Sequence, residues 1–444
     1  MSKCIVIGGG LAGLSTAVYL SEKKIPVHVI EASPKLGGRA YSLFNKNFTD
    51  VFDNGQHILM GCYHNTLEFL NKIGSSKLLE FQKSLSINFV ERGGKLNKLE
   101  ALENFYPFNF LWGILNYKPL SLKERFKIVD FFLDLACCFE EDLTEKNIDE
   151  WLKAKGQSEK SLKAFWEILI VGALNTSPKK ASASMFAAVL KRIFFDGSQS
   201  ASIVIPKVGL SELYIRQSEK FIEMNSGIIS TSERVIEVVA HNNRIKKIIT
   251  DKNVYDDFDY AISTVPPHAL DKIIFTCENS GQEKLVVQFK NEINKIQYSS
   301  ILNVHLWLKE NLFDKKFYGL IDSKIHWVFN HGTHISLTTS NADEFNNSNN
   351  AEIVEKFCSE LEKYFPIFKR NLVVDSKVIK EKRATFIPDT QSNSVRKKVY
   401  SPFANLIFAG DWANTGLPST IESAVCSGKN AAEKIISNIN GDTY

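Results

Sequence analysis

The chain has 444 residues but no apolar run of the roughly 18 residues that a membrane-spanning helix needs. The nearest is the uncharged aromatic stretch 104–117, NFYPFNFLWGILNY, which is short and interrupted by Asn and Pro. Such a stretch forms either buried core or an interfacial surface, and the sequence favours neither. The apolar run after Lys3 is also too short, and its glycines indicate a structural turn better than a signal peptide.

Basic blocks and metal-ligand clusters are missing as well. The formal net charge is only +4, and no Lys/Arg block is long enough to indicate nucleic-acid binding. Seven cysteines are scattered without a CxxC pair or metal-ligand spacing. We therefore expect no nucleic-acid partner, no metal site and no disulfide framework, and a reducing, cytoplasmic compartment.

The chain does have a glycine turn at its very start. An apolar run at 4–7 leads into a Gly-x-Gly-x-x-Gly turn, an amphipathic stretch at 11–23 and a second apolar run at 27–30. An acid follows at once, 18 residues after the last glycine (31 − 13). This order predicts a strand, a phosphate loop, a helix, a second strand and a ribose-binding acid, which together form a dinucleotide site.

Each residue type in this turn has a physical role. Gly8 allows the tight turn, Gly10 lets the backbone approach a diphosphate, and Gly13 lets the helix lie close to the strand. The helix N-terminus then presents the positive end of its dipole to the phosphates. The alternative is an ordinary strand–helix–strand turn that binds nothing. The predicted dinucleotide contacts are Gly8, Gly10, Leu11, Ala12, Gly13, Glu31 and Ala32.

A second glycine pair narrows the cofactor. Gly37 and Gly38 let the chain pass close to a second phosphate, and Arg39 supplies a forked donor for it. The glycine turn, the acid and this Gly-Gly-Arg step resemble the flavoproteins related to amine oxidases and carotenoid desaturases. That resemblance implies FAD, tightly bound, rather than an exchangeable nicotinamide cofactor.

Segments far apart in the chain carry similar signals. A strand pair at 234–249 turns at an Asn-Asn step, a buried strand at 260–265 stops at Pro-Pro, and a tail strand at 405–411 precedes a capped helix. We therefore predict an α/β fold in which a Rossmann-like FAD-binding domain is interleaved with an α+β substrate-binding domain. The FAD-binding domain is predicted at 1–70, 205–275 and 399–444. The substrate-binding region is predicted at 71–204 and 276–398, with its helical, membrane-facing part, and helices that wall an apolar pocket, within 71–204.

Two further segments are candidates for contact with the flavin. Gly55 permits close approach to the ring, while Gln56 and His57 are polar groups that could face the ring or the substrate. For His57 the alternative is a structural histidine bonded to a backbone carbonyl. In the tail, a Gly-Asp step contacts the ribityl chain or phosphates in this fold, and the helix dipole behind it stabilises charge on reduced flavin. The further predicted cofactor contacts are Gly38, Arg39, Gly55, Val235, Gly410, Asp411 and Ile421.

The segments 53–74 and 409–432 resemble phytoene desaturases of the plant type, and their Asp-Asn-Gly-Gln-His, Gly-Asp-Trp and Thr-Gly-Leu-Pro forms resemble hydroxysqualene dehydroxylases more closely. The stretch 174–183 resembles those enzymes too. The resemblance implies reduction of hydroxysqualene to squalene, with hydride from reduced flavin and loss of water. His57 is then our candidate for protonating the leaving hydroxyl, with Gln56 as an orienting donor.

Several alternatives stay open. A carotenoid or other polyene desaturase uses the same scaffold in the oxidative direction, and an amine oxidase is a more distant alternative. A different class is a non-catalytic isoprenoid-binding escort protein. A C30 substrate must come from a bilayer, so we expect an apolar isoprenoid partner and peripheral attachment to a membrane, for which 105–117 is the candidate segment. The sequence points to no electron donor.

Overall fold

The structure, a computed structural model, describes residues 2–441. It begins with strand β1 (Cys4–Ile7), helix α1 (Leu11–Glu22) and strand β2 (Val27–Ile30), so the strand–helix–strand unit is confirmed. The expectation that the helix is amphipathic is wrong, because every residue from Leu11 to Ser21 is buried. Helix α14 (Ile421–Asn440) packs along α1 and shields it from solvent.

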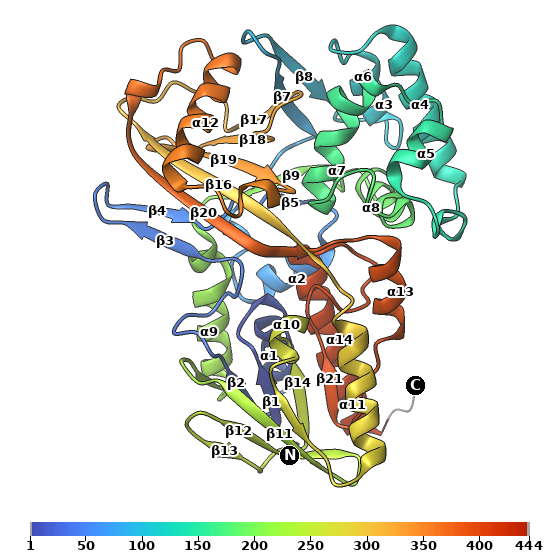
Figure 1. Cartoon of the computed structure of the whole chain (residues 1–444), viewed down its shortest axis with the longest axis vertical. Helices are drawn as coiled ribbons and strands as arrows, with labels where there is room; N and C mark the ends of the chain where they lie inside the picture. The colour runs from blue at the N-terminus through green and yellow to red at the C-terminus, as the bar shows by residue number, and fades with distance from the viewer. Residues whose placement is uncertain (1, 442–444) are drawn as a thin grey trace.

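Three distant segments build one parallel sheet, in the order β10-β2-β1-β14-β21 (Figure 1). Strands β10 (Ile228–Ser230) and β14 (Tyr260–Ser263) come from the middle of the chain, and β21 (Leu406–Phe408) comes from its tail. All neighbouring pairs are parallel, so their carboxyl ends meet at one edge. This is the doubly wound dinucleotide-binding arrangement, and the predicted α/β class is confirmed.

The predicted strand pair is also present. Strands β11 (Val235–His241) and β12 (Arg244–Thr250) are antiparallel. Asn242 and Asn243 join them with φ of 48° and 59°, the left-handed conformation that asparagine tolerates best after glycine. Two short strands complete this sheet: β13 (Val254–Tyr255) and β15 (Ile274–Thr276).

The predicted strand end at the Pro-Pro step and the predicted start of the tail helix are both present. The Pro-Pro step ends β14 but also begins a short helix, α10 (Pro267–Leu270), since proline suits the first helical position. The tail helix α14 begins after Thr420, whose side chain accepts a hydrogen bond from Ser423 N at 3.1 Å. The predicted capped helix is therefore confirmed.

A seven-stranded mixed sheet lies above the parallel sheet in Figure 1. One of its faces packs against α12 (Asn350–Tyr364), while the other contributes side chains to a core shared with α7 (Glu167–Leu174) and α8 (Ala183–Phe195). Its strands, in spatial order, are β20 (Val373–Phe386), β16 (Tyr298–Leu308), β19 (His334–Ser340), β18 (Trp327–Asn330), β17 (Phe317–Leu320), β7 (Ser86–Val90) and β8 (Leu96–Glu100).

Helices gather at one side of this sheet (Figure 1). One of them is α4 (Leu122–Cys137), which begins at a capping box between Ser121 and Glu124. The aromatic stretch 105–117 is divided, because Phe110 is buried whereas Phe108 and Trp112 are exposed. The other helices here are α3 (Asn109–Leu115), α5 (Ile148–Ala154), α6 (Glu159–Ser161), α7 (Glu167–Leu174) and α8 (Ala183–Phe195).

No helix within residues 2–441 is both long and apolar enough to cross a membrane.

The other elements are short strands and further α-helices. The remaining strands are β3 (Ser42–Asn45), β4 (Asp50–Asp53), β5 (Leu59–Met60), β6 (Leu79–Phe81) and β9 (Ile203–Pro206). The remaining helices are α2 (His64–Lys72), α9 (Arg216–Met224), α11 (Ser280–Ile293) and α13 (Thr390–Lys398).

Candidate functional site

One cavity of about 1160 Å³ runs from the carboxyl edge of the parallel sheet to the helices beside the mixed sheet. Ligand pockets usually measure roughly 300–1,000 Å³, so this one has room for more than one small molecule. Its glycine end is lined by Gly8, Gly10, Glu31, Gly38, Arg39, Gly410, Asp411, Ser419 and Thr420. Its apolar end is lined by Leu85, Ile87, Phe110, Ile168, Phe186, Leu190, Phe194, Trp327 and Phe329.

The glycine end is shaped by backbone that leaves no space for side chains. Gly8 has φ of 108°, which disfavours any side chain there. Gly10 and Gly38 face each other so closely that a Cβ on Gly38 would lie 3.3 Å from Gly10 Cα. Gly10 also precedes α1 without a side-chain cap, so the first amides of that helix face the cavity. This is an anion-binding cradle.

Glu31 is fixed at the edge of the cradle. One carboxylate oxygen accepts a hydrogen bond from Gly9 N at 2.6 Å and the other accepts from Ser33 N at 2.7 Å. The side chain lines the cavity at the carboxyl end of β2. It is therefore held where a ribose hydroxyl of a bound dinucleotide would reach it.

Most of the predicted cofactor residues line this cavity, namely Gly8, Gly10, Leu11, Ala12, Glu31, Ala32, Gly38, Arg39, Gly55, Gly410, Asp411 and Ile421. Gly13 and Val235 are not among the residues that line it. A Cβ on Gly13 would lie 1.9 Å from Gly8 O, so Gly13 supports the turn by close packing, as expected from the motif. Val235 is buried in an adjacent core.

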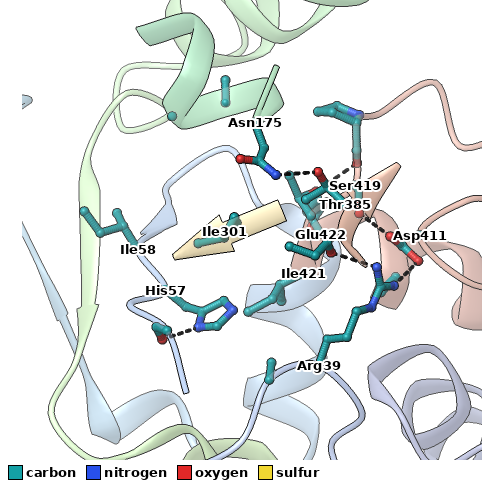
Figure 2. Close-up of a pocket in the computed structure, with 18 of the residues that line it drawn as sticks. Arg39, His57, Ile58, Asn175, Ile301, Thr385, Asp411, Ser419, Ile421 and Glu422 are labelled. Carbon is teal, nitrogen blue, oxygen red and sulfur yellow. Dashed lines mark hydrogen bonds and ion pairs between the residues drawn. The ribbon is translucent and has the colours of Figure 1, made fainter. Parts of the chain in front are cut away.

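Arg39 lines the cavity, as the predicted phosphate contact requires, but its guanidinium also has protein partners. One arm of its guanidinium donates to Asp411 and the other to Ala384 O at 2.8 Å (Figure 2). Asp411 also accepts from Ser419 Oγ. Burial alone would raise the pKa of Asp411, but the Arg39 charge and these hydrogen bonds outweigh it and hold that pKa below its usual range. Two of the five N–H donors of Arg39 are therefore used by protein groups, and its contact with a phosphate stays a prediction.

The loop after β4 brings the predicted catalytic side chains to the cavity. Gly55 must be small, because a Cβ there would lie 2.8 Å from Asn303 Nδ2. His57 Nδ1 donates to Gly55 O at 2.8 Å, which leaves Nε2 as an acceptor (Figure 2). Burial lowers the pKa of His57, and the Gly55 carbonyl only partly offsets it. Gln56 lines the cavity and has no hydrogen-bond partner within residues 2–441.

His57 therefore shows both of the features that the sequence analysis considered for it. It bonds a backbone carbonyl, as a structural histidine does, and it also lines the cavity beside Gln56. Near neutral pH its ring is uncharged, because its pKa lies below 6.5. It can donate a proton from Nε2 only in the protonated form, whose share grows as the pH falls.

Sequence reasoning missed two polar residues on the cavity wall. Asn303 is buried on β16, accepts from Thr338 Oγ1 at 2.8 Å and donates to Asn54 O at 3.3 Å. Asn175 ends α7 with φ of 48° and donates to Thr385 Oγ1 at 2.8 Å. A left-handed asparagine after a helix is a recognisable signal, whereas Asn303 lies inside an ordinary strand pattern.

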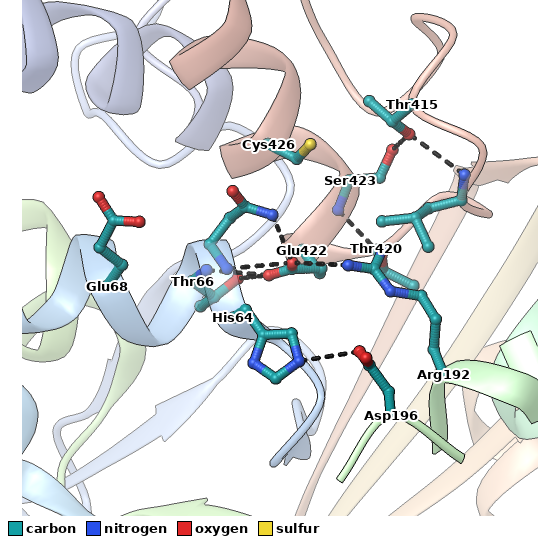
Figure 3. Close-up of polar contacts among 12 residues, drawn as sticks. His64, Thr66, Glu68, Arg192, Asp196, Thr415, Thr420, Glu422, Ser423 and Cys426 are labelled. Atoms are coloured by element: carbon teal, nitrogen blue, oxygen red, sulfur yellow. Dashed lines mark hydrogen bonds and ion pairs between the residues drawn. The ribbon is translucent and has the colours of Figure 1, made fainter. Parts of the chain in front are cut away.

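Glu422, in the first turn of α14, has partners on a different helix. Its carboxylate accepts from the amides of Asn65 and Thr66 at 3.1 and 2.9 Å, at the start of α2 (Figure 3). Helix α2 has no side-chain cap of its own, so Glu422 provides it from another helix. Arg192 approaches the same carboxylate at 3.9 Å.

The apolar end is walled mainly by helices from 71–204, as expected. Phe110 on α3 and Phe194 on α8 stack with ring centroids 4.0 Å apart, and both line the cavity. Trp327 and Phe329 contribute from β18 on the opposite sheet. These rings give this end of the cavity an apolar wall, which suits an apolar ligand.

The residues at the glycine end fit a flavin dinucleotide. The paired glycines suit its diphosphate, Glu31 is placed where a ribose hydroxyl could bond it, and the N-terminus of α14 lines the same cavity. The apolar end leaves space for a second molecule beside it. Fold and site together define a dinucleotide-dependent oxidoreductase.

Comparison with known proteins identifies the family. The model of the flavin containing amine oxidoreductases matches residues 11–436, and the chain belongs to this family, with FAD as cofactor. Among curated proteins, a hydroxysqualene dehydroxylase of Zymomonas mobilis is 27% identical over 99% of this chain and 100% of its own length. A 15-cis-phytoene desaturase of an Oncidium hybrid is 24% identical over 97% of this chain and 77% of its own length.

Solved structures agree on the fold. An oxidoreductase from Methanosarcina mazei superposes with a TM-score of 0.74 at 20% identity, over 97% of this chain and 100% of its own. A cyclohexylamine oxidase from Brevibacterium oxydans superposes with a TM-score of 0.70 at 15% identity, over 99% of both chains. At these identities the likeness shows the fold alone.

Proposed function

We propose that this protein reduces hydroxysqualene, or a similar C30 allylic alcohol, to the hydrocarbon with loss of water. The observation that carries the proposal is the single cavity that joins the glycine end to a long aromatic pocket. The named hydroxysqualene dehydroxylases, which match over nearly the whole chain, support the same substrate class. The balance is R–OH plus hydride plus a proton, giving R–H and water.

The aromatic wall suits this reaction. Reduced flavin, when bound, supplies the hydride. Breaking an allylic C–O bond leaves positive charge spread over the substrate, and the faces of Phe110, Phe194 and Trp327 are favourable surroundings for such a charge. The same side chains exclude water, which would otherwise capture the cation.

The leaving hydroxyl needs a hydrogen-bond donor and a proton. Gln56 lines the cavity with its amide unpaired, so it can donate to the hydroxyl oxygen. His57 Nε2 can pass a proton to that oxygen after taking it up from solvent. We expect His57→Ala to lower turnover while FAD stays bound. Unchanged single-turnover reduction of the substrate in that variant would remove His57 from the mechanism.

The decisive experiment is anaerobic. The purified flavoprotein is reduced, hydroxysqualene is added, and the oxidised-flavin absorption band and the lipid extract are followed together. Reappearance of the band with an equal amount of squalene supports the proposal. Without that reappearance, bleaching of the oxidised protein by phytoene or another polyene assigns the protein to the desaturases, a second candidate that the phytoene desaturase relatives favour.

A non-catalytic isoprenoid-binding escort protein is the alternative from another class. Against it, the cradle, Glu31 and the α14 N-terminus all converge on the cavity, and a carrier needs none of them. A colourless protein that binds the lipid but no FAD would favour the escort role.

We further propose that the protein is cytoplasmic and attaches peripherally to a membrane through the region around α3. Phe108 and Trp112 are 61% and 53% exposed, and the same region carries Phe105, Tyr106 and Phe126 as exposed aromatics. Three exposed lysines without ion-pair partners in the described chain, Lys118, Lys123 and Lys127, flank them and suit anionic headgroups.

Liposome flotation tests this attachment. Polar substitutions at Phe108 and Trp112 should release the protein from vesicles that contain anionic lipid. The control is Ile367→Ser, because Ile367 is equally exposed at 61% on a different part of the fold. Flotation that survives the changes at Phe108 and Trp112 excludes this region as the anchor.

A further inference from the structure

The glycine end binds a cofactor whose diphosphate carries two negative charges, but its obvious cation is already used. Arg39 is paired with Asp411, so the two charges cancel. Glu31 adds another negative charge at the same end. The dipoles of α1 and α14 contribute only about half an elementary charge each. Further positive charge is needed to balance the diphosphate.

A bulge in strand β20 brings such charge to the cavity. Strand β16 pairs with β20 through Ser299 with Thr385 and Ile301 with Glu381. Three residues of β20, Lys382 to Ala384, therefore lie opposite Ser300 alone. Bulges of this kind redirect side chains and are frequent beside active sites. Here all three bulged residues line the cavity.

A hydrogen bond joins the bulge directly to Arg39 at the glycine end. The carbonyl of Ala384 accepts the second arm of Arg39 at 2.8 Å. The backbone next to Arg383 is therefore fixed against the Arg39–Asp411 pair. Arg383 belongs to the mixed sheet, far in sequence from the glycine turn, and reaches the same end of the cavity.

The two bulge cations, Lys382 and Arg383, have free charges. Both are exposed and line the cavity, and neither has an ion-pair or hydrogen-bond partner within residues 2–441. Glu381 beside them also lines the cavity, which leaves one net positive charge on the bulge. The charge of Arg383 acts on His268: burial lowers the pKa of His268 to about 4, and Arg383, Arg39 and Lys272 add to the effect.

We propose that Arg383, assisted by Lys382, binds the diphosphate of FAD across the cavity from the glycine turn. A planar guanidinium can pair with two phosphate oxygens, and no Arg39 donor has to leave Asp411. His268 lines the cavity nearby with a buried Nδ1 that has no partner in the described chain, and it offers a further polar contact. This goes beyond the proposed function, because it concerns cofactor retention and holds whatever the substrate.

Flavin release tests the proposal without any substrate. The full-length holoprotein is diluted, and the freed FAD is measured by its fluorescence to give Kd. Riboflavin, which has the ring and the ribityl chain but no phosphate, is then used as a competitor. Arg383→Gln should raise the Kd for FAD about tenfold, the effect of losing one charge-assisted hydrogen bond, and leave the Kd for riboflavin unchanged. Arg383→Lys should recover part of the loss.

The matched control is Lys377→Gln, because Lys377 is an exposed, unpaired cation on the same strand that does not line the cavity. It should leave both constants unchanged. Added salt should weaken FAD binding less in Arg383→Gln than in the wild type. A Kd for FAD within twofold of the wild type, or an equal loss for riboflavin, would overturn the proposal.

Discussion

The two ends of the cavity are built by different means. At the glycine end, backbone atoms and a few short motifs make the surface, and a methyl group added at Gly8 or Gly13 would come closer than 3 Å to other atoms. At the apolar end, side chains from α3, α7, α8 and two strands make the surface, and each contributes one part of a wall. The glycine end is therefore sensitive to atoms added at such backbone positions, whereas the apolar end responds to changes in volume.

Two glycine-to-alanine changes in helices measure this difference, and the first should have the largest effect of all. Gly13 on α1 and Gly172 on α7 both lie inside helices. A Cβ on Gly13 would lie 1.9 Å from a backbone oxygen, so Gly13→Ala should displace the turn, cost about 3 kcal/mol and abolish FAD retention. Flavin content and urea unfolding measure both effects.

Gly172→Ala is the matched control. Its nearest neighbour would be Trp327 Nε1 at 3.6 Å, an ordinary contact, and alanine favours a helix by about 1 kcal/mol. We expect full flavin content and unchanged or slightly higher stability. Similar losses of flavin in both variants would mean that the two ends do not differ as described.

A larger residue at the same glycine should separate the functions of the two ends. Gly172 lines the cavity, so a leucine side chain there occupies space that a long substrate needs. Gly172→Leu should keep FAD bound and lower turnover about 100-fold, the loss expected when a substrate is displaced by about 1 Å. Loss of flavin instead of turnover would contradict the separation.

The same contrast explains how much could be predicted from sequence. The glycine turn, Glu31 and the cap of α14 depend on neighbours within a few residues, so their spacing alone predicted them. The partner of Arg39 lies 372 residues away and that of Glu422 lies 357 residues away, and no local pattern reports such pairs. The buried faces of α1 and the place of Asn303 depend likewise on packing between distant segments.

Glu422 lies where the two ends meet, and its loss should have an intermediate effect. Its buried carboxylate accepts from both amides at the start of α2 and from the Thr66 hydroxyl at 2.7 Å. Glu422→Ala should cost about 2 kcal/mol, because it leaves these buried donors and Arg192 unpaired. Glu433→Ala on the exposed face of the same helix should change stability by less than about 0.5 kcal/mol. Equal losses in the free energy of unfolding for the two variants, measured in urea, would refute the role of Glu422 as the cap of α2.

The smallest effect concerns His57, which lines the cavity beside Gly55 and Gln56. Its pKa lies below 6.5 in the folded protein, so its protonated share at neutral pH is small and grows by at most about tenfold for each pH unit of acidification. If His57 passes the proton to the leaving hydroxyl, turnover should rise as the pH falls from about 8 to 7, and His57→Gln should remove this rise. His241→Gln, an exposed histidine paired with Glu278, serves as the control.

Stability sets the lower limit of the pH range for that experiment. A pKa lowered on folding contributes stability that is complete above 6.5 and is lost as the pH falls through the folded value. Measurements above about pH 6.5 therefore report the reaction rather than unfolding. Turnover that falls on mild acidification, and falls equally in His57→Gln, would show that the imidazole only positions the loop through Gly55 and that another group supplies the proton.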